Sequence, residues 1–352
     1  MDIADLYAQY DFAKLEEETA ALFPEWNISF QELFTQIVSG EGMQLLKDIA
    51  LQFLDKLANE IGGMKYLLVT LLFIGILSAV FTNLTGIFEN RQLSDCGFYF
   101  TYLILIIFLI RICTQVFQIA KGSLETIVTF MRLFLPTYFL TVGAAGGSVS
   151  ALGFYQIFMM AVYGVEILLM GFILPIIGCY MILNVVNGIW EEEKLSLMIR
   201  LIKKSIRMIL KVLITLVSGT GLIQSMITPV IDTAKMELIQ KSVSAMPGLG
   251  DIAGGAAQIL LGSAVLIKNA AGILLLVLLA IICAIPLCKL LVITALLKLS
   301  AAMMGIAADK RMTNCTNKIG DGVMMLFQTT LTSFTFFLIL VSLVAFTTNR
   351  GF

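Results

Sequence analysis

The chain becomes continuously apolar at Tyr66-Leu67-Leu68-Val69-Thr70-Leu71-Leu72-Phe73-Ile74, the start of an uncharged run that continues to Phe88. This run of 23 residues can cross a bilayer, because a spanning helix needs about 20 mostly apolar residues. Lipid offers the backbone no hydrogen-bond partner, so only helices or closed barrels span it. Long apolar runs without polar alternation exclude a barrel. We therefore expect helices from this point to the end of the chain.

Composition extends this expectation to most of the chain. Hydrophobic residues make up 59% of the sequence and charged residues 13%, whereas soluble proteins carry about 25% charged residues. The predicted fold class is all-α, a polytopic α-helical membrane protein with seven to nine spans, and the apolar runs favour nine. Residues 64–352 form this membrane domain.

Three regions set the expected number of spans. Residues 97–120 and 133–154 are expected to be separate crossings. Residues 155–190 are too long for one crossing, so we expect two short ones that break near Gly171 and Pro175. Residues 270–288 and 290–308 are expected to be two further crossings, followed by a polar loop over residues 309–321.

Residues 1–63 form a different segment, an acidic and helical head. The first 65 residues hold 12 Asp or Glu and 4 Lys or Arg. Lys and Arg are retained on the cytoplasmic side of a membrane, so a head with few of them suits the extracytoplasmic side. With the head outside, nine crossings would put Phe352 in the cytoplasm.

A basic amphipathic helix is predicted at residues 191–213. Apolar residues recur at spacings of three and four, which places them on one helical face. They are Leu195, Met198, Ile199, Ile202, Ile206, Ile209 and Leu213. The opposite half carries the candidate cytoplasmic docking face, Arg200, Lys203, Lys204, Arg207 and Lys211. Such a helix lies at the cytoplasmic headgroup surface or docks on a cytoplasmic partner, and the sequence leaves both interpretations open.

Three charged residues inside apolar runs are the candidate intramembrane pair or pathway. They are Glu166, Arg111 and Arg132. A Lys or Arg at mid-helix costs roughly 2.5–3.5 kcal/mol on insertion scales, so such residues pair with a counter-charge or line a wet cavity. We expect Glu166 to pair with Arg111 or Arg132, and the sequence does not separate a structural pair from a functional one.

Two clusters of small residues are candidates for close helix packing or for broken helices. The first contains Gly143, Gly146 and Gly147, and the second contains Gly254 and Gly255. Small residues let helices approach closely in lipid. The first cluster follows Pro136, so a broken segment beside a water-filled cavity is the alternative.

The sequence contains no recognisable catalytic motif. It contains no His, which is the commonest general base and metal ligand. It has no phosphate-binding GxxxxGK[ST] loop and no GxSxG turn. The six Cys form no CxxC pair and are interpreted as packing residues. We expect no enzyme activity, no cofactor, no metal and no nucleic-acid partner.

The chain resembles the stage III sporulation protein AE family of endospore-forming bacteria, in segments from about the first span to the end. The matching segments are Leu135-Pro136, Gly146-Gly147-Ser148-Val149-Ser150-Ala151, Thr233-Ala234-Lys235, Pro247-Gly248-Leu249-Gly250, Leu266-Ile267-Lys268-Asn269 with Gly272, and Ala284-Ile285-Pro286 followed by Lys289, Lys298, Leu299, Ala301 and Ala302. Their order and spacing together are specific, whereas each segment alone is weak.

The resemblance implies a non-enzymatic membrane component of the sporulation channel, or feeding tube, that links mother cell and forespore. The expected location is the mother-cell membrane around the forespore. The implied partners are a cytoplasmic secretion-type ATPase, other membrane subunits and ring-forming subunits between the two membranes. The alternative function is a stand-alone secondary transporter or permease for a small solute, whose marks are midplane charges on broken helices.

Overall fold

The computed structural model describes residues 51–52, 55, 57–59, 62–87, 91–142, 148–190, 194–215, 250–306 and 308–349. All regular structure in these residues is helical. The named helices are α5 (Lys65–Ile87), α6 (Arg91–Val142), α7 (Ser148–Val165), the π-helix η2 (Glu166–Ile173), α8 (Leu174–Asn187), α10 (Gly250–Met304) and α11 (Lys310–Asn349). A further helix covers residues 196–215 and is called the basic helix below.

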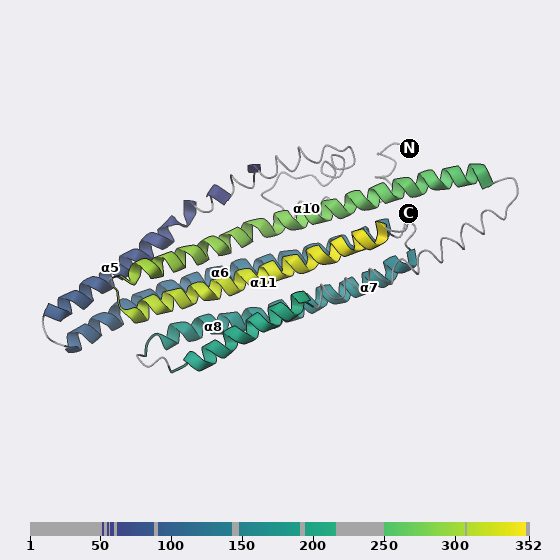
Figure 1. The fold of residues 1–352 in the computed structure, drawn as a ribbon. Helices are drawn as coiled ribbons and strands as arrows, with labels where there is room; N and C mark the ends of the chain where they lie inside the picture. The colour runs from purple at the N-terminus through teal and green to yellow at the C-terminus, as the bar shows by residue number, and fades with distance from the viewer. Residues whose placement is uncertain are drawn as a thin grey trace.

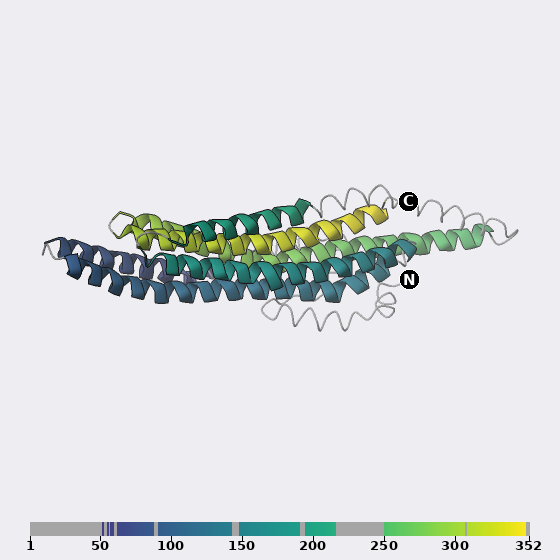
Figure 2. The same cartoon turned by 90° about the horizontal axis from the view of Figure 1, so that it is seen from below.

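The helices run side by side in one elongated bundle (Figures 1 and 2). The turns between α5 and α6, between α8 and the basic helix, and between α10 and α11 all lie at one end, which we call the basic end (left in Figure 1). The chain ends of α6, α11 and the basic helix lie toward the opposite end. Consequently α6 and α11 run parallel to each other, and α10 runs antiparallel to both.

Four helical segments are long and apolar enough to cross a membrane, by length and composition: Cys96–Val142, Tyr155–Asn187, Asn269–Met304 and Lys310–Ser342. A shorter apolar helix covers Lys65–Val80. This search covered the described residues, so the predicted seven to nine spans remain a prediction. The head, residues 1–63, lies largely outside the described part of the chain.

Several expected helix breaks are wrong. Residues 97–120 belong to α6, a single helix of 52 residues that contains Pro136. Residues 270–304, expected to turn between two crossings, belong to the 55-residue α10, which contains Pro286. The break expected near Gly171 and Pro175 is also absent, since α7, η2 and α8 follow one another directly. Gly171 lies in the π-helix η2, and Pro175 occupies the first turn of α8. Neighbouring helices and local adjustments of the turn let a helix in a packed membrane domain tolerate proline.

The helices are much longer than a bilayer is thick. At about 1.5 Å per residue, α6 and α10 extend for roughly 80 Å, whereas the hydrocarbon core is about 30 Å thick. The expected polar loop at residues 309–321 is also helical, because α11 begins at Lys310. Each long helix therefore extends beyond the lipid. The charged segment of each helix indicates which part of it lies outside the lipid.

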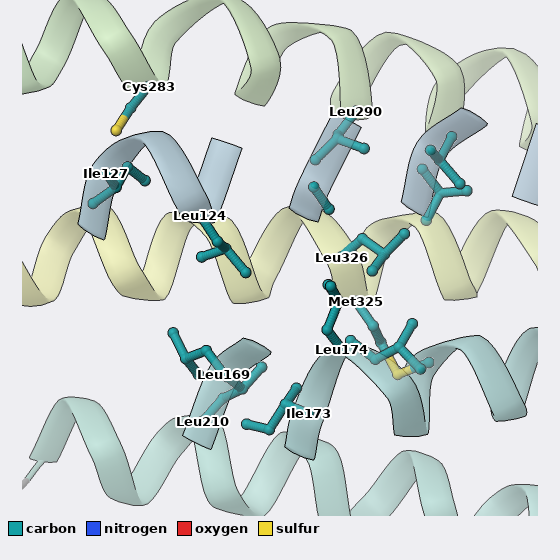
Figure 3. Close-up of a cluster of buried hydrophobic side chains, with 14 of the residues drawn as sticks. Leu124, Ile127, Leu169, Ile173, Leu174, Leu210, Cys283, Leu290, Met325 and Leu326 are labelled. Atoms are coloured by element: carbon teal, nitrogen blue, oxygen red, sulfur yellow. The ribbon is translucent and has the colours of Figure 1, made fainter. Parts of the chain in front are cut away.

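One apolar core joins the helices along the bundle. Figure 3 shows side chains of this core from six elements: Leu124 and Ile127 of α6, Leu169 and Ile173 of η2, Leu174 of α8, Leu210 of the basic helix, Cys283 and Leu290 of α10, and Met325 and Leu326 of α11. All are at most 5% exposed. In lipid such packing stabilises the bundle through van der Waals contact, because lipid tails are as apolar as these side chains.

Candidate functional site

Among the described residues, two clusters of charged side chains join different helices of the bundle, and the first is centred on Asp321. Its Oδ2 accepts a hydrogen bond from Lys203 Nζ at 2.5 Å, and its Oδ1 accepts one from Lys298 Nζ at 2.7 Å. The Lys203 and Asp321 side chains are about one quarter exposed and that of Lys298 is 42% exposed. One carboxylate thus pairs with two ammonium groups and ties the basic helix to α10 and α11. We call these three residues the Asp321 cluster.

Two glycines make the Asp321 cluster possible, since α11 reads Gly320-Asp321-Gly322 here. A Cβ at Gly320 would lie 3.2 Å from Lys298 Cγ, and one at Gly322 would lie 2.5 Å from Met181 Cγ. Helices α10 and α8 therefore approach α11 closely on either side of the acid. The sequence prediction missed Asp321 because this residue was assigned to a loop. The signal that could have identified it is an acidic residue between two glycines, next to a long apolar run.

The second cluster joins Arg132 of α6 to Glu166, the first residue of η2. Arg132 Nη2 donates to Glu166 Oε2, and its guanidinium carbon lies 4.8 Å from the centre of the Tyr163 ring. Both charged side chains are about one third exposed, and Arg132 Nε is buried without a protein partner. In the structure, the ion-pair partner of Glu166 is therefore Arg132 and not Arg111.

The π-helical turn that follows Glu166 belongs to this cluster. π-Helical turns are rare and occur frequently at functional sites. Gly164 lies just before the turn and Gly171 lies within it, and a Cβ at either would meet nothing within 4 Å. The turn therefore has open space beside it, next to an ion pair that lies within a span candidate.

The basic helix packs by the predicted apolar face. Ile199, Ile206 and Leu213 are buried, and Leu195, Ile202 and Ile209 are partly buried. Met198 is half exposed instead, and Leu210 is buried in addition. The Asn187 Oδ1 atom accepts a hydrogen bond from the Leu195 backbone N–H at 2.9 Å, which fixes the turn into this helix.

The structure divides the candidate docking face. Arg200, Lys204, Arg207 and Lys211 are exposed, whereas Lys203 points into the bundle and binds Asp321. We call these four exposed residues the basic face. The basic helix also runs along the bundle rather than across its end (Figure 1).

The remaining candidates are placed as follows. Gly254 and Gly255 lie in the first turns of α10, where the chain is helical rather than broken. Gly143, Gly146 and Gly147 lie outside the described residues. Among the residues that the structure describes, no three His, Cys, Asp or Glu side chains gather as metal ligands.

Known proteins are similar to this chain over most of its length. A family described as stage III sporulation protein AE matches residues 28–348. The Bacillus subtilis (strain 168) protein named Stage III sporulation protein AE is 24% identical over 290 residues, which cover 82% of this chain and 73% of that protein. No solved structure matches. The chain belongs to the stage III sporulation protein AE family.

Proposed function

We propose that this protein is a non-enzymatic membrane component of the channel that links mother cell and forespore during sporulation. Family membership supports a role in sporulation. Four apolar helices support a location in a membrane, and we place it in the mother-cell membrane around the forespore. The observation that carries the specific role is the basic face: four cations remain exposed on a helix whose opposite side is packed into the bundle.

The distribution of charge supports an orientation with the basic end in the cytoplasm. Residues 194–204 and 298–321, in and next to the turns at the basic end, hold eight Lys or Arg. The segments that follow α6, the basic helix and α11 in the sequence, 143–147, 216–249 and 350–352, hold three. Because Lys and Arg are retained on the cytoplasmic side, the basic end faces the cytoplasm. The opposite end then faces the ring-forming subunits between the two membranes.

In this orientation, the basic face is available to a soluble partner. Its cations are complementary to an acidic surface. We propose that the cytoplasmic secretion-type ATPase of the channel is the partner that carries this acidic surface. Lys203 is not part of the contact, since it binds Asp321.

Reversing the charges of the basic face should abolish this contact without unfolding the bundle. In the variant R200E/K204E/R207E/K211E, we expect loss of co-purification with the ATPase and a severe loss of heat-resistant spores. The four side chains are exposed, so the melting temperature of the detergent-purified protein should stay close to that of the parent. Spore counts, co-purification and melting curves measure the three outcomes.

The matched control is R200K/K204R/R207K/K211R, which keeps every charge and should behave like the parent. Co-purification that survives the fourfold reversal would refute docking through the basic face.

The Arg132–Glu166 pair favours a second candidate function, secondary transport of a small solute. An ion pair inside a span and beside a π-helical turn is the kind of arrangement that lines substrate pathways. If the protein transports, purified protein in liposomes should take up solute, and Glu166→Gln should abolish the uptake. The exchange variant Arg132→Glu with Glu166→Arg distinguishes the roles. It should restore folding if the pair is structural, but leave transport impaired if Glu166 itself acts in the pathway.

A further inference from the structure

Three buried hydroxyl groups in the bundle have no hydrogen-bond partner among the described residues. They belong to Ser123 of α6 and to Thr330 and Ser333 of α11, and these residues are at most 6% exposed. Other buried hydroxyls bond to a carbonyl of their own helix, as Ser300 Oγ does to Leu296 O at 2.7 Å. Burying an unpaired hydroxyl is unfavourable, so in native proteins such groups pair with protein atoms or with ordered water.

The helical period shows which neighbours the two hydroxyls of α11 face. Thr330 lies 18 residues after Met312, whose sulfur accepts a hydrogen bond from Thr101 of α6. Ser333 lies 18 residues after Cys315, whose sulfur donates a hydrogen bond to the backbone of α8. Since 3.6 residues make one turn, a spacing of 18 residues brings a side chain back to the same face. Thr330 therefore faces α6, and Ser333 faces the helix that η2 and α8 form together.

Ser123 of α6 faces the same two neighbours. Helix α6 contacts α11 through Thr101, and it contacts α8 through Tyr102, whose hydroxyl donates to Val185 O at 2.8 Å. At about 100° per residue, Ser123 projects roughly 40° from the direction of Thr101 and roughly 60° from that of Tyr102. Its direction lies between the two, so the hydroxyl points to where α6, α11 and the η2–α8 helix meet.

The three hydroxyls also lie at one level of the bundle. Helices α6 and α11 run parallel, and Thr101 contacts Met312 (Figure 1). Twenty-two residues further along each helix, Ser123 is level with Phe334. This position is next to Ser333 and about one turn from the other hydroxyl of α11. Side-chain direction and level together place the three hydroxyls in one group.

The π-helix η2 provides the third wall at this level. Helix α8 runs antiparallel to α11, and a Cβ at Gly322 would lie 2.5 Å from Met181 Cγ. Eleven residues further along α11, and eleven residues back toward η2, Ser333 is level with Met170 in the middle of η2. The Arg132–Glu166 pair is close to this level, because Glu166 begins η2. We call the place where α6, α11 and η2 meet at Ser123, Thr330 and Ser333 the hydroxyl seam.

We propose that the hydroxyl seam binds water and forms a hydrated path inside a single chain, which leads to the Arg132–Glu166 pair. A hydroxyl group both donates and accepts hydrogen bonds, so three of them suit water and small uncharged polar solutes. Arg132 Nε, which is buried without a protein partner, adds a donor at the far end. The passage of a solute rests on the second candidate function and names its route, whereas the hydration of the seam stands without that function.

Thiol accessibility tests the hydration of the seam. The test uses purified protein in liposomes, with the six native Cys replaced by Ser or Ala. A small water-soluble methanethiosulfonate reagent attacks the thiolate, which forms in water, so Ser333→Cys and Ser123→Cys should react about tenfold faster than Ser300→Cys. Ser300 is the matched control, because it is 0% exposed and its hydroxyl is bonded within α10. Equal protection of the three thiols would overturn the proposal.

Melting curves provide an independent measure of the same contact. Ser333→Ala and Ser300→Ala gain the same helix propensity, so the difference between their midpoints reports the two hydroxyls. A hydroxyl bonded to water stabilises the fold, so Ser333→Ala should melt about 1–2 °C below Ser300→Ala. An equal or higher midpoint for Ser333→Ala would show that its hydroxyl is unpaired, which contradicts a hydrated seam.

The uptake experiment separates this proposal from the functions proposed above. Reactive seam thiols in a protein that takes up no solute would confirm the hydrated seam and refute the passage of a solute. Solute uptake with all three thiols protected would place the route elsewhere and overturn the seam. The fourfold reversal of the basic face leaves the three hydroxyls unchanged, so docking and the hydrated seam fail separately.

Discussion

Replacing Asp321 with Asn should destabilise the protein more than any other single change to a charged residue that the structure describes. The change is nearly isosteric, so it removes charge and little volume. It leaves the Lys203 and Lys298 ammonium groups next to each other without their shared counter-charge. Removing one partner of a buried ion pair costs about 3–5 kcal/mol. These side chains are about one quarter to two fifths exposed, so solvent screening reduces the expected cost to roughly 2–3 kcal/mol.

A melting curve of the detergent-purified protein measures this loss, which should lower the midpoint by about 3–4 °C. Glu125→Gln is the matched control: it also removes one carboxylate from an ion pair, but that pair is half exposed and should count for little. The triple variant D321N/K203Q/K298Q should recover most of the loss, because it leaves no unpaired charge. A midpoint for Asp321→Asn within one degree of the parent would show that Asp321 does not hold the three helices together.

Gly322→Val should give the second large loss by forcing α8 away from α11. The first added carbon would already lie 2.5 Å from Met181 Cγ and 3.2 Å from its sulfur, and valine adds two further methyl groups. Overpacking a dense interior costs about 1–3 kcal/mol. The shift would also move the neighbouring Asp321 away from Lys203, so the expected loss is at the upper end of that range.

Gly164→Val provides the control, because a Cβ at Gly164 meets nothing within 4 Å. Met181→Ala should partly rescue Gly322→Val by emptying the space that valine needs. Melting midpoints of these four proteins decide the matter: if Gly322→Val and Gly164→Val melt together with the parent, the close contact between α8 and α11 does not stabilise the fold.

The sequence predicted the helical nature of the chain and the packed face of the basic helix. Both follow from local signals, since apolar runs must be helical in lipid and Ile199, Ile206 and Leu213 recur with the helical period. The lengths of the helices were not predictable in this way. Pro136 and Pro286 are strong local breakers, but here they lie inside α6 and α10, because neighbouring helices hold the turn together.

The candidate site was predicted only in part, for a related reason. The pairing of Glu166 with one of two arginines could be predicted from free-energy cost alone, because an unpaired charge in a span is costly to insert into lipid. The Asp321 cluster joins residues from three helices, at positions 203, 298 and 321. No periodicity links these positions; only the arrangement of the bundle brings them together. Lys203 was therefore placed on the docking face, although its side chain points inward.

The most direct test of the account is the side of the membrane on which the two ends of α11 lie. With the basic end in the cytoplasm, Lys310 lies in the cytoplasm and Asn349 outside, which reverses the cytoplasmic C-terminus expected from nine crossings. Single-cysteine variants Lys310→Cys and Asn349→Cys can be labelled with a membrane-impermeant maleimide in intact protoplasts of a bacterium that produces the protein, with the native cysteines replaced. We predict labelling of Asn349→Cys in intact protoplasts and of Lys310→Cys only after lysis. Labelling of both positions from the same side would contradict α11 as a spanning helix, and the reverse pattern would contradict the orientation of the basic end.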